Sequence, residues 1–112
     1  MLDRIKAVLQ SAGIAVYDPG VKIGECKQSY AVARSLGVET LPGSKGLLGR
    51  RTYEVLLVVP LAQQSELAAM AESVKAAMAS LPLRLSSVTD QDLEQAYRAA
   101  GCSLIYTQNL RL

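Results

Sequence analysis

The stretch Leu41–Leu81, LPGSKGLLGRRTYEVLLVVPLAQQSELAAMAESVKAAMASL, decides how this chain folds. It begins with a basic loop punctuated by glycines and continues into the most apolar run of the sequence, Thr52–Val59. Pro60 ends that run, because proline cannot donate a hydrogen bond to a strand ladder. An amphipathic helix is then predicted over Ser65–Leu81, with Ser65 as its N-cap and Pro82 as its stop. The stretch therefore predicts a loop, a strand and a helix in that order.

The predicted strand Thr52–Val59 is apolar on both of its faces, since successive side chains of a strand point to opposite sides. One face carries Tyr53, Val55, Leu57 and Val59, and the other carries Leu56 and Val58 beside the polar Thr52 and Glu54. A strand that is apolar on both sides needs cover on both sides. In a chain of 112 residues the helices can cover one face of a sheet, so we expect a neighbouring subunit to cover the other.

Four segments are predicted on the N-terminal side of this stretch. Apolar residues at helical spacing predict a helix over Leu2–Ala12, which ends at Gly13, and an ordered loop follows over Ile14–Gln28. Alternating side chains predict a strand over Ser29–Leu36. Closely spaced Gly and Pro residues predict a long loop over Val38–Arg51, and loops of this length tend to be functional or to order on assembly.

Three segments are predicted on the C-terminal side. Imperfect alternation over Leu83–Thr89 indicates a strand with a bulge or an edge position. A short helix is predicted over Asp90–Ala100 on propensity, and a last strand over Cys102–Thr107. The sequence therefore predicts a single α+β domain over residues 1–112, in the order helix, two strands, helix, two strands. In this fold the helices pack on one face of a mainly antiparallel four-stranded sheet.

Composition places the chain among ordinary globular proteins. Half of the residues are apolar and a fifth are charged, while Phe and Trp are absent and five Tyr are the only aromatic residues. The formal net charge of +2 is too small to indicate a dedicated nucleic-acid surface or a membrane anchor. Charged residues interrupt the apolar pattern at the N-terminus, so no signal peptide is expected there. The prediction is a soluble, cytoplasmic protein.

Few residues of this chain are suited to catalysis or to ligand binding. Without any His, a catalytic triad or a histidine base is excluded. The glycine loop GSKGLLGRR lacks the Lys-Ser/Thr pair of a phosphate-binding loop and precedes a strand where such a loop precedes a helix. Cys26 and Cys102 are far apart in sequence and are predicted to be reduced, partly buried thiols. No catalytic residue, cofactor or metal site is predicted, and we do not expect an enzyme.

The segments SKGLLGRRTYEVLLVVPL (Ser44–Leu61) and SELAAMAESVKAAM (Ser65–Met78) together resemble a known protein family. These are small proteins encoded in the tail-assembly regions of phages and phage-derived tail particles of Gram-positive bacteria, described as minor capsid, head-tail joining or tail terminator proteins. Upstream, VKIGECKQSYAVAR (Val21–Arg34) is similar to the family's first strand and its lead-in.

This resemblance implies an α+β subunit similar to the tail terminators of phages with contractile or non-contractile tails. Such proteins form a ring, hexameric in the family, that caps the tail tube and joins it to the neck or head. The implied protein is structural and has no cofactor. Its implied partners are further copies of itself, the tail tube protein, and sheath and neck or connector proteins, with DNA only as non-specific cargo through the lumen and no membrane. Its location would be the virion or tail particle, assembled in the cytoplasm of the bacterial host.

The candidate interface residues are Lys45, Arg50 and Arg51 of the basic loop together with Leu56 and Val58 of the apolar strand. We expect them to form one side of a contact with a neighbouring subunit or the tail tube. Simple solvation of a loop also explains the three cations. Two other functions stay open: a head-completion or connector adaptor on the portal side, and a small dimeric ligand-binding α+β module.

Overall fold

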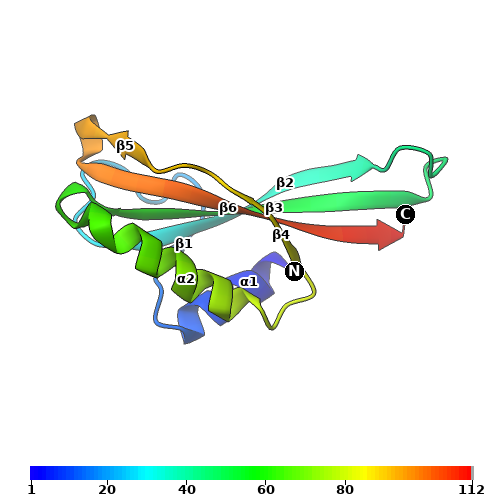
Figure 1. Cartoon of the computed structure of the whole chain (residues 1–112), viewed down its shortest axis with the longest axis horizontal. Helices are drawn as coiled ribbons and strands as arrows, with labels where there is room; N and C mark the ends of the chain where they lie inside the picture. Colours follow the sequence, from blue (N-terminus) through cyan, green and yellow to red (C-terminus); the bar gives the residue numbers. More distant parts are fainter. Residues whose placement is uncertain (112) are drawn as a thin grey trace.

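Two helices lie on one face of a single six-stranded sheet in the computed structural model, which describes residues 1–111 (Figure 1). In chain order the elements are α1 (Leu2–Ser11), β1 (Val16–Tyr17), β2 (Tyr30–Thr40), β3 (Leu48–Pro60), the 3₁₀ turn η1 (Leu61–Glu66), α2 (Leu67–Met78), β4 (Arg84–Val88), β5 (Asp92–Glu94), the 3₁₀ turn η2 (Gln95–Tyr97) and β6 (Ala99–Arg111). The chain is therefore a compact α+β domain, as the sequence predicts.

The strands are ordered β1-β2-β3-β6-β4, and β5 pairs with β6 beyond the end of β4. Only the pair β1 and β2 is parallel, whereas all the other pairs are antiparallel. The prediction of four strands is wrong, because two short strands escape the sequence pattern. β1 spans two residues inside the predicted loop Ile14–Gln28, and β5 spans three inside the predicted helix Asp90–Ala100. Strands this short have too few residues to show alternation.

The predicted loop Val38–Arg51 is mostly strand. β2 continues to Thr40 and β3 begins at Leu48, so that only seven residues between them form the turn. Gly43 and Gly46 in this turn have φ of +78°, a conformation that glycine adopts at little cost. β6 pairs with β3 along its whole length, from Leu48 to Pro60. This partner strand, far away in sequence, extends the ladder into a segment that its glycines and proline mark as a loop.

The core lies between the sheet and the two helices, and β3 supplies its centre. The predicted face of Tyr53, Val55, Leu57 and Val59 is confirmed, since each of these side chains is at most 2% exposed. The helices contribute Ile5 and Leu9 from α1 and Leu67, Ala71, Val74 and Met78 from α2. Burying each large aliphatic side chain contributes about 1.5–3 kcal/mol, which is how the fold is stabilised without Phe or Trp.

The helix predicted over Ser65–Leu81 is confirmed in its body, but its start is wrong and it ends at Met78, three residues before Leu81. α2 begins at Leu67 after η1, and Ser65 makes no capping hydrogen bond to the helix. α2 begins later than predicted because the chain leaves β3 at Pro60 and immediately forms the 3₁₀ turn η1. The Leu61 N–H donates to the Arg98 carbonyl oxygen at 2.8 Å, and this hydrogen bond holds the turn against the start of β6.

The helix predicted over Asp90–Ala100 is wrong. Its residues form β5, the turn η2 and the first residues of β6, and Arg98 has a left-handed backbone with φ of 49°. The Ser103 N–H donates to Thr89 Oγ1 at 2.8 Å, and this bond anchors the incoming chain beside β6. Pairing with β6 therefore overrides a modest helix propensity. The edge position of β4 and its bulge, between Leu85 and Ser87, are confirmed.

Candidate functional site

The sheet has one face that neither helix covers, called here the open face (Figure 1). Its register brings apolar side chains of β2 and β3 together in two rows, Tyr30–Val58 and Val32–Leu56, which β6 continues with Gly101 and Ser103. Tyr30, Val32, Leu56 and Val58 are all half-buried. Side chains directly opposite one another in neighbouring strands lie about 5 Å apart, so these residues shield one another and leave a continuous apolar surface.

An ion pair marks the end of this apolar surface. Arg34 on β2 lies opposite Glu54 on β3, and Arg34 Nε donates to Glu54 Oε1 at 2.5 Å. The Glu54 side chain is only 15% exposed, which strengthens the hydrogen bond relative to one in water. The open face is thus apolar on one side of this pair and becomes polar on the other.

At its other end the open face is bordered by the segment between β1 and β2. The Cys26 N–H of this segment donates to the Tyr97 carbonyl oxygen at 2.8 Å, and this bond ties the segment to η2. A hollow of about 330 Å³ remains between them. The residues that line the hollow include Ile23, Cys26, Tyr30, Val58, Glu94 and Tyr97. The hollow is therefore mostly apolar, with the Glu94 carboxylate and the Lys22 side chain at its border.

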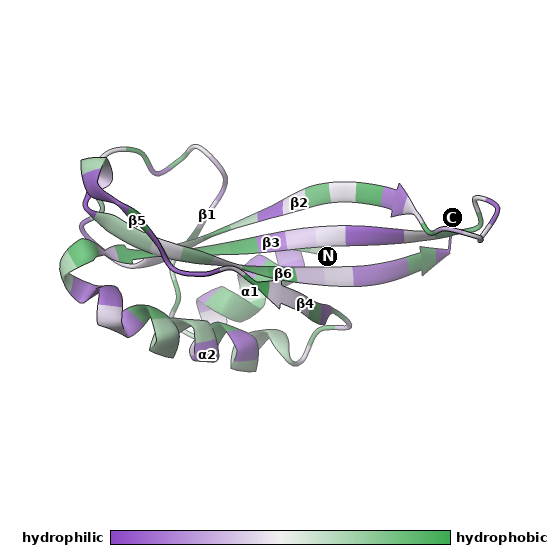
Figure 2. Cartoon of the chain, turned by 45° about the horizontal axis from the view of Figure 1, so that its top comes forward, coloured by the Kyte–Doolittle hydropathy of each residue, from purple (hydrophilic) through white to green (hydrophobic). Residues whose placement is uncertain are grey.

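Beyond the Arg34–Glu54 pair the three long strands continue without any helix on either side. We call this three-stranded extension the arm and define it as residues 35–52 with residues 107–111 (Figures 1 and 2). Figure 2 shows hydrophobic residues continuing along β2 into the arm and hydrophilic residues on its β3 and β6 strands. The arm contains four cations and a single carboxylate, Glu39, so it is strongly basic. The cations are Lys45, Arg50, Arg51 and Arg111.

The predicted interface residues lie on two separate surfaces. Lys45 is at the turn of the arm, with φ of 55°, and Arg50 and Arg51 point to opposite faces of β3. Arg50 Nη1 lies 3.6 Å from Glu39 Oε1 on the neighbouring strand. Leu56 and Val58 belong to the open face. Since a strand advances about 3.3 Å per residue, Arg50 and Leu56 are roughly 20 Å apart, and the structure does not bring the five residues together.

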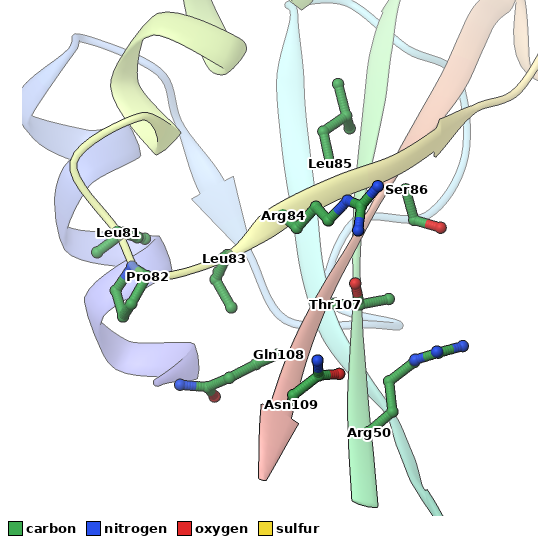
Figure 3. A pocket seen from close by; sticks show the side chains of 10 residues that line it. All are labelled: Arg50, Leu81, Pro82, Leu83, Arg84, Leu85, Ser86, Thr107, Gln108 and Asn109. Carbon is green, nitrogen blue, oxygen red and sulfur yellow. The ribbon is translucent and has the colours of Figure 1, made fainter. Parts of the chain in front are cut away.

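A second hollow, of about 480 Å³, lies where β4 meets the base of the arm (Figure 3). Arg84 and Ser86 of β4 line it together with Arg50, Thr107 and Asn109 of the arm. Figure 3 shows the guanidinium groups of Arg84 and Arg50 on either side of Thr107. Neither Arg84 nor this hollow is predicted by the sequence, because no local pattern connects β4 with residues of β3 and β6 that are distant in the chain.

The titratable groups of the core are not set up for chemistry. Burial raises the pKa of the thiols of Cys26 and Cys102 above its ordinary value, so both stay protonated at neutral pH. Both cysteines are buried and neither forms a disulfide, which agrees with the prediction of unpaired, partly buried thiols. Within residues 1–111 no three His, Cys, Asp or Glu side chains gather closely enough to hold a metal ion. None of the helices in that range combines the length and apolarity needed to cross a membrane.

Comparison of the chain with models of known protein families finds no match, and comparison with curated proteins finds no significant match either. The open face, the arm and the sequence resemblance are therefore the features that bear on function.

Proposed function

We propose that this protein is a tail terminator, a structural subunit of a phage tail or of a phage-derived tail particle. Copies of the chain would form a ring of six on the end of the tail tube and join the tube to the neck or head. The resemblance of Ser44–Leu61 and Ser65–Met78 to that family supports this proposal. The two helices on one face of an antiparallel-rich sheet are compatible with it.

The observation that carries the proposal is the pair of surfaces that the chain leaves uncovered. The open face is apolar around Leu56 and Val58, and the arm extends beyond the helices with both faces accessible. A ring with cyclic symmetry needs two different patches on each subunit, because each copy contacts its two neighbours in different ways. An elongated subunit, 49 Å along its long axis, with uncovered surfaces in two places suits this requirement.

The basic arm also suits a ring through which DNA passes. Cations of the arm that stay outside contacts between subunits would interact with phosphate groups without reading the base sequence, as electrostatic contacts to nucleic acid do. A loose, salt-sensitive interaction of this kind lets DNA slide, which cargo in a lumen has to do.

Electron microscopy of tail tubes tests the proposal. The purified chain is mixed with tubes assembled from the tube protein encoded in the same genome, and native mass measurement establishes how many copies associate. We expect extra density on one end of each tube and a ring mass that is a multiple of the subunit mass. A chain that stays monomeric in the presence of tubes and never marks their ends would contradict the function.

A pull-down separates the terminator from a connector adaptor. The tagged chain is incubated separately with tube protein and with portal protein from the same genome. A terminator retains the tube protein, whereas an adaptor on the portal side retains the portal protein.

A further inference from the structure

The large apolar side chains that stay exposed gather mostly at the two ends of the long axis. On the arm they are Leu36, Val38, Leu47 and Leu48, and at the other end they are Val21, Ile23, Leu93 and Tyr97. The two remaining ones, Leu85 and Val88, lie on β4. Figure 1 shows β5 at one end of the molecule and the turn between β2 and β3 at the other. Both ends therefore carry apolar surface that a partner can bury.

The arm and the segment Asp90–Glu94 at the opposite end of the molecule carry opposite charge. The arm is basic, whereas the segment Asp90–Glu94 at the far end holds three carboxylates in five residues. None of these three carboxylates makes an ion pair within the described part of the chain. We call this segment, together with the hollow of about 330 Å³ beside it, the acidic end. Lys22 also lines the hollow, where its ammonium group lies over the Tyr17 ring at 4.7 Å.

We propose that the arm of one copy of this chain docks on the acidic end of a second copy. The leucines at the turn of the arm, Leu47 and Leu48, pack into the hollow beside Val58. The cations of the arm, with Lys45 and Arg50 foremost, face the carboxylates of β5. This contact explains both surfaces at once, because the arm has an excess of cations and Asp90–Glu94 has only carboxylates.

The detailed layout of the two ends supports this match. Leu48 and Arg50 are two residues apart on β3, so their side chains point to the same side of the arm. At the acidic end, Glu94 pairs with Ala99 on β6, and its side chain borders the hollow together with Val58. An apolar group beside a charged group thus occurs on both ends. The hollow falls within the roughly 300–1,000 Å³ of pockets that hold small organic groups, so it can receive a leucine side chain.

Such a contact joins different patches of two copies, which is a heterologous contact, and it closes into a ring when the rotation between neighbours permits. This docking rests on the proposed function in one respect only, which is that it would be the contact between subunits of the proposed ring. It makes a claim of its own, which is that the Val58 end of the open face and the basic arm form opposite sides of one interface, whereas the sequence pattern puts Val58 and the arm on the same side.

Charge reversal on each side separately, followed by mixing, tests the proposal. One variant carries Lys45→Glu and Arg50→Glu, and the other carries Asp92→Lys and Glu94→Lys. Each variant alone then places like charges at every contact. In an equimolar mixture, every contact between the two variants again joins opposite charges, in both directions around a ring. A control variant with Arg4→Glu and Lys75→Glu changes the charge by the same amount on the helices.

Sedimentation velocity measures the outcome, with thermal unfolding to confirm that each variant is folded. We expect the wild-type chain and the control to associate, with weaker association as salt rises, because exposed charge pairs are screened. Each reversed variant should associate about tenfold more weakly or not at all, and the mixture should recover. Association of both reversed variants at wild-type strength, or a mixture that fails to recover, would overturn the proposal. So would a wild-type chain that stays monomeric at every concentration.

The same variants separate this proposal from the proposed function. If the reversed variants still cap tail tubes at wild-type levels, the docking of arm on acidic end is wrong while the terminator function stands. If the mixture recovers association but even the wild-type chain never marks tube ends, the docking stands and the terminator function is wrong.

Discussion

Replacing Gly101 with alanine tests how closely the two central strands approach beside the acidic end. Gly101 lies on β6, opposite Val58 on β3 and Asp92 on β5. A Cβ atom at this position would lie 2.8 Å from the Leu57 carbonyl oxygen, closer than non-bonded carbon and oxygen atoms approach. Because that oxygen belongs to the backbone of the central strand, a rotamer change cannot relieve the contact. β6 has to shift away from β3 by several tenths of an ångström.

The magnitude follows from two opposing terms. Overpacking of this kind costs about 1–3 kcal/mol, and replacing a strand glycine by alanine recovers about 0.5–1 kcal/mol of unfolded-state entropy. The net loss for Gly101→Ala is therefore about 1–2 kcal/mol of the free energy of unfolding. For a domain of this length such a loss lowers the Tm by roughly 4–8 °C.

Thermal and urea unfolding of Gly101→Ala beside Ser103→Ala provide the measurement. Ser103 is the next residue on the same face of β6 and already has a Cβ, so its variant tests only the loss of the hydroxyl group. We expect the Ser103 variant to stay within about 1 kcal/mol of the wild type. A Gly101 variant as stable as the wild type, or more stable, would refute the argument from close approach. Because β5 pairs with β6 at Gly101, the same variant should also weaken self-association through the acidic end.

Three more predictions concern the open face, its ion pair and the core. Leu57→Ala should cost about 2–5 kcal/mol of unfolding free energy, because the side chain is fully buried. Leu56→Ala, on the half-buried open face, should cost only about 1 kcal/mol and mainly weaken self-association. Equal costs for the two variants in urea unfolding would contradict the assignment of the two faces. Arg34 and Glu54 should show a coupling of about 0.5–1 kcal/mol in a double-mutant cycle of unfolding free energies, and a coupling of zero would show that the pair contributes nothing. Burial raises the pKa of Tyr106, so the folded state favours the neutral phenol. The stability that comes from burying the neutral phenol is present below the ordinary tyrosine pKa of about 10 and is lost as the pH rises above it. Tyr106→Phe should reduce this alkaline loss of stability in unfolding measured across that range, and an unchanged pH profile would argue against the burial.

The sequence predicted the core well, because the core depends on periodicity. The alternation along Thr52–Val59 identified the buried face of β3, and the helical spacing after it identified the buried face of α2. Both patterns are long enough for the period to be counted. The bulge and the edge position predicted for Leu83–Thr89 are also present, because the bulge is what breaks the alternation of side chains along this strand.

The sequence did not predict the features that depend on distant partners. The segment Val38–Arg51 contains three glycines and a proline, and on local composition it is a loop. Most of it is strand, because β2, β3 and β6 pair along their full lengths, and the β6 residues that pair with this segment lie more than fifty residues away in sequence. The segment Asp90–Ala100 was assigned to a helix for the same reason, since only its pairing with β6 determines its conformation. The arm and the acidic end are both products of these pairings.

The resulting distribution of apolar residues has a consequence for solubility as well as for assembly. A monomer with an uncovered apolar sheet face, and with exposed leucines on a free three-stranded extension, presents strand edges that can pair with any other chain. Charged side chains commonly prevent such pairing of strand edges. In this chain the cations lie beside the leucines on the arm, and the carboxylates lie at the opposite end. Two arms therefore repel each other, as do two acidic ends, and only an arm and an acidic end attract. With the docking proposed above, these charges would oppose aggregation through like ends and favour contacts in a single direction, which is the kind of contact from which a ring is built.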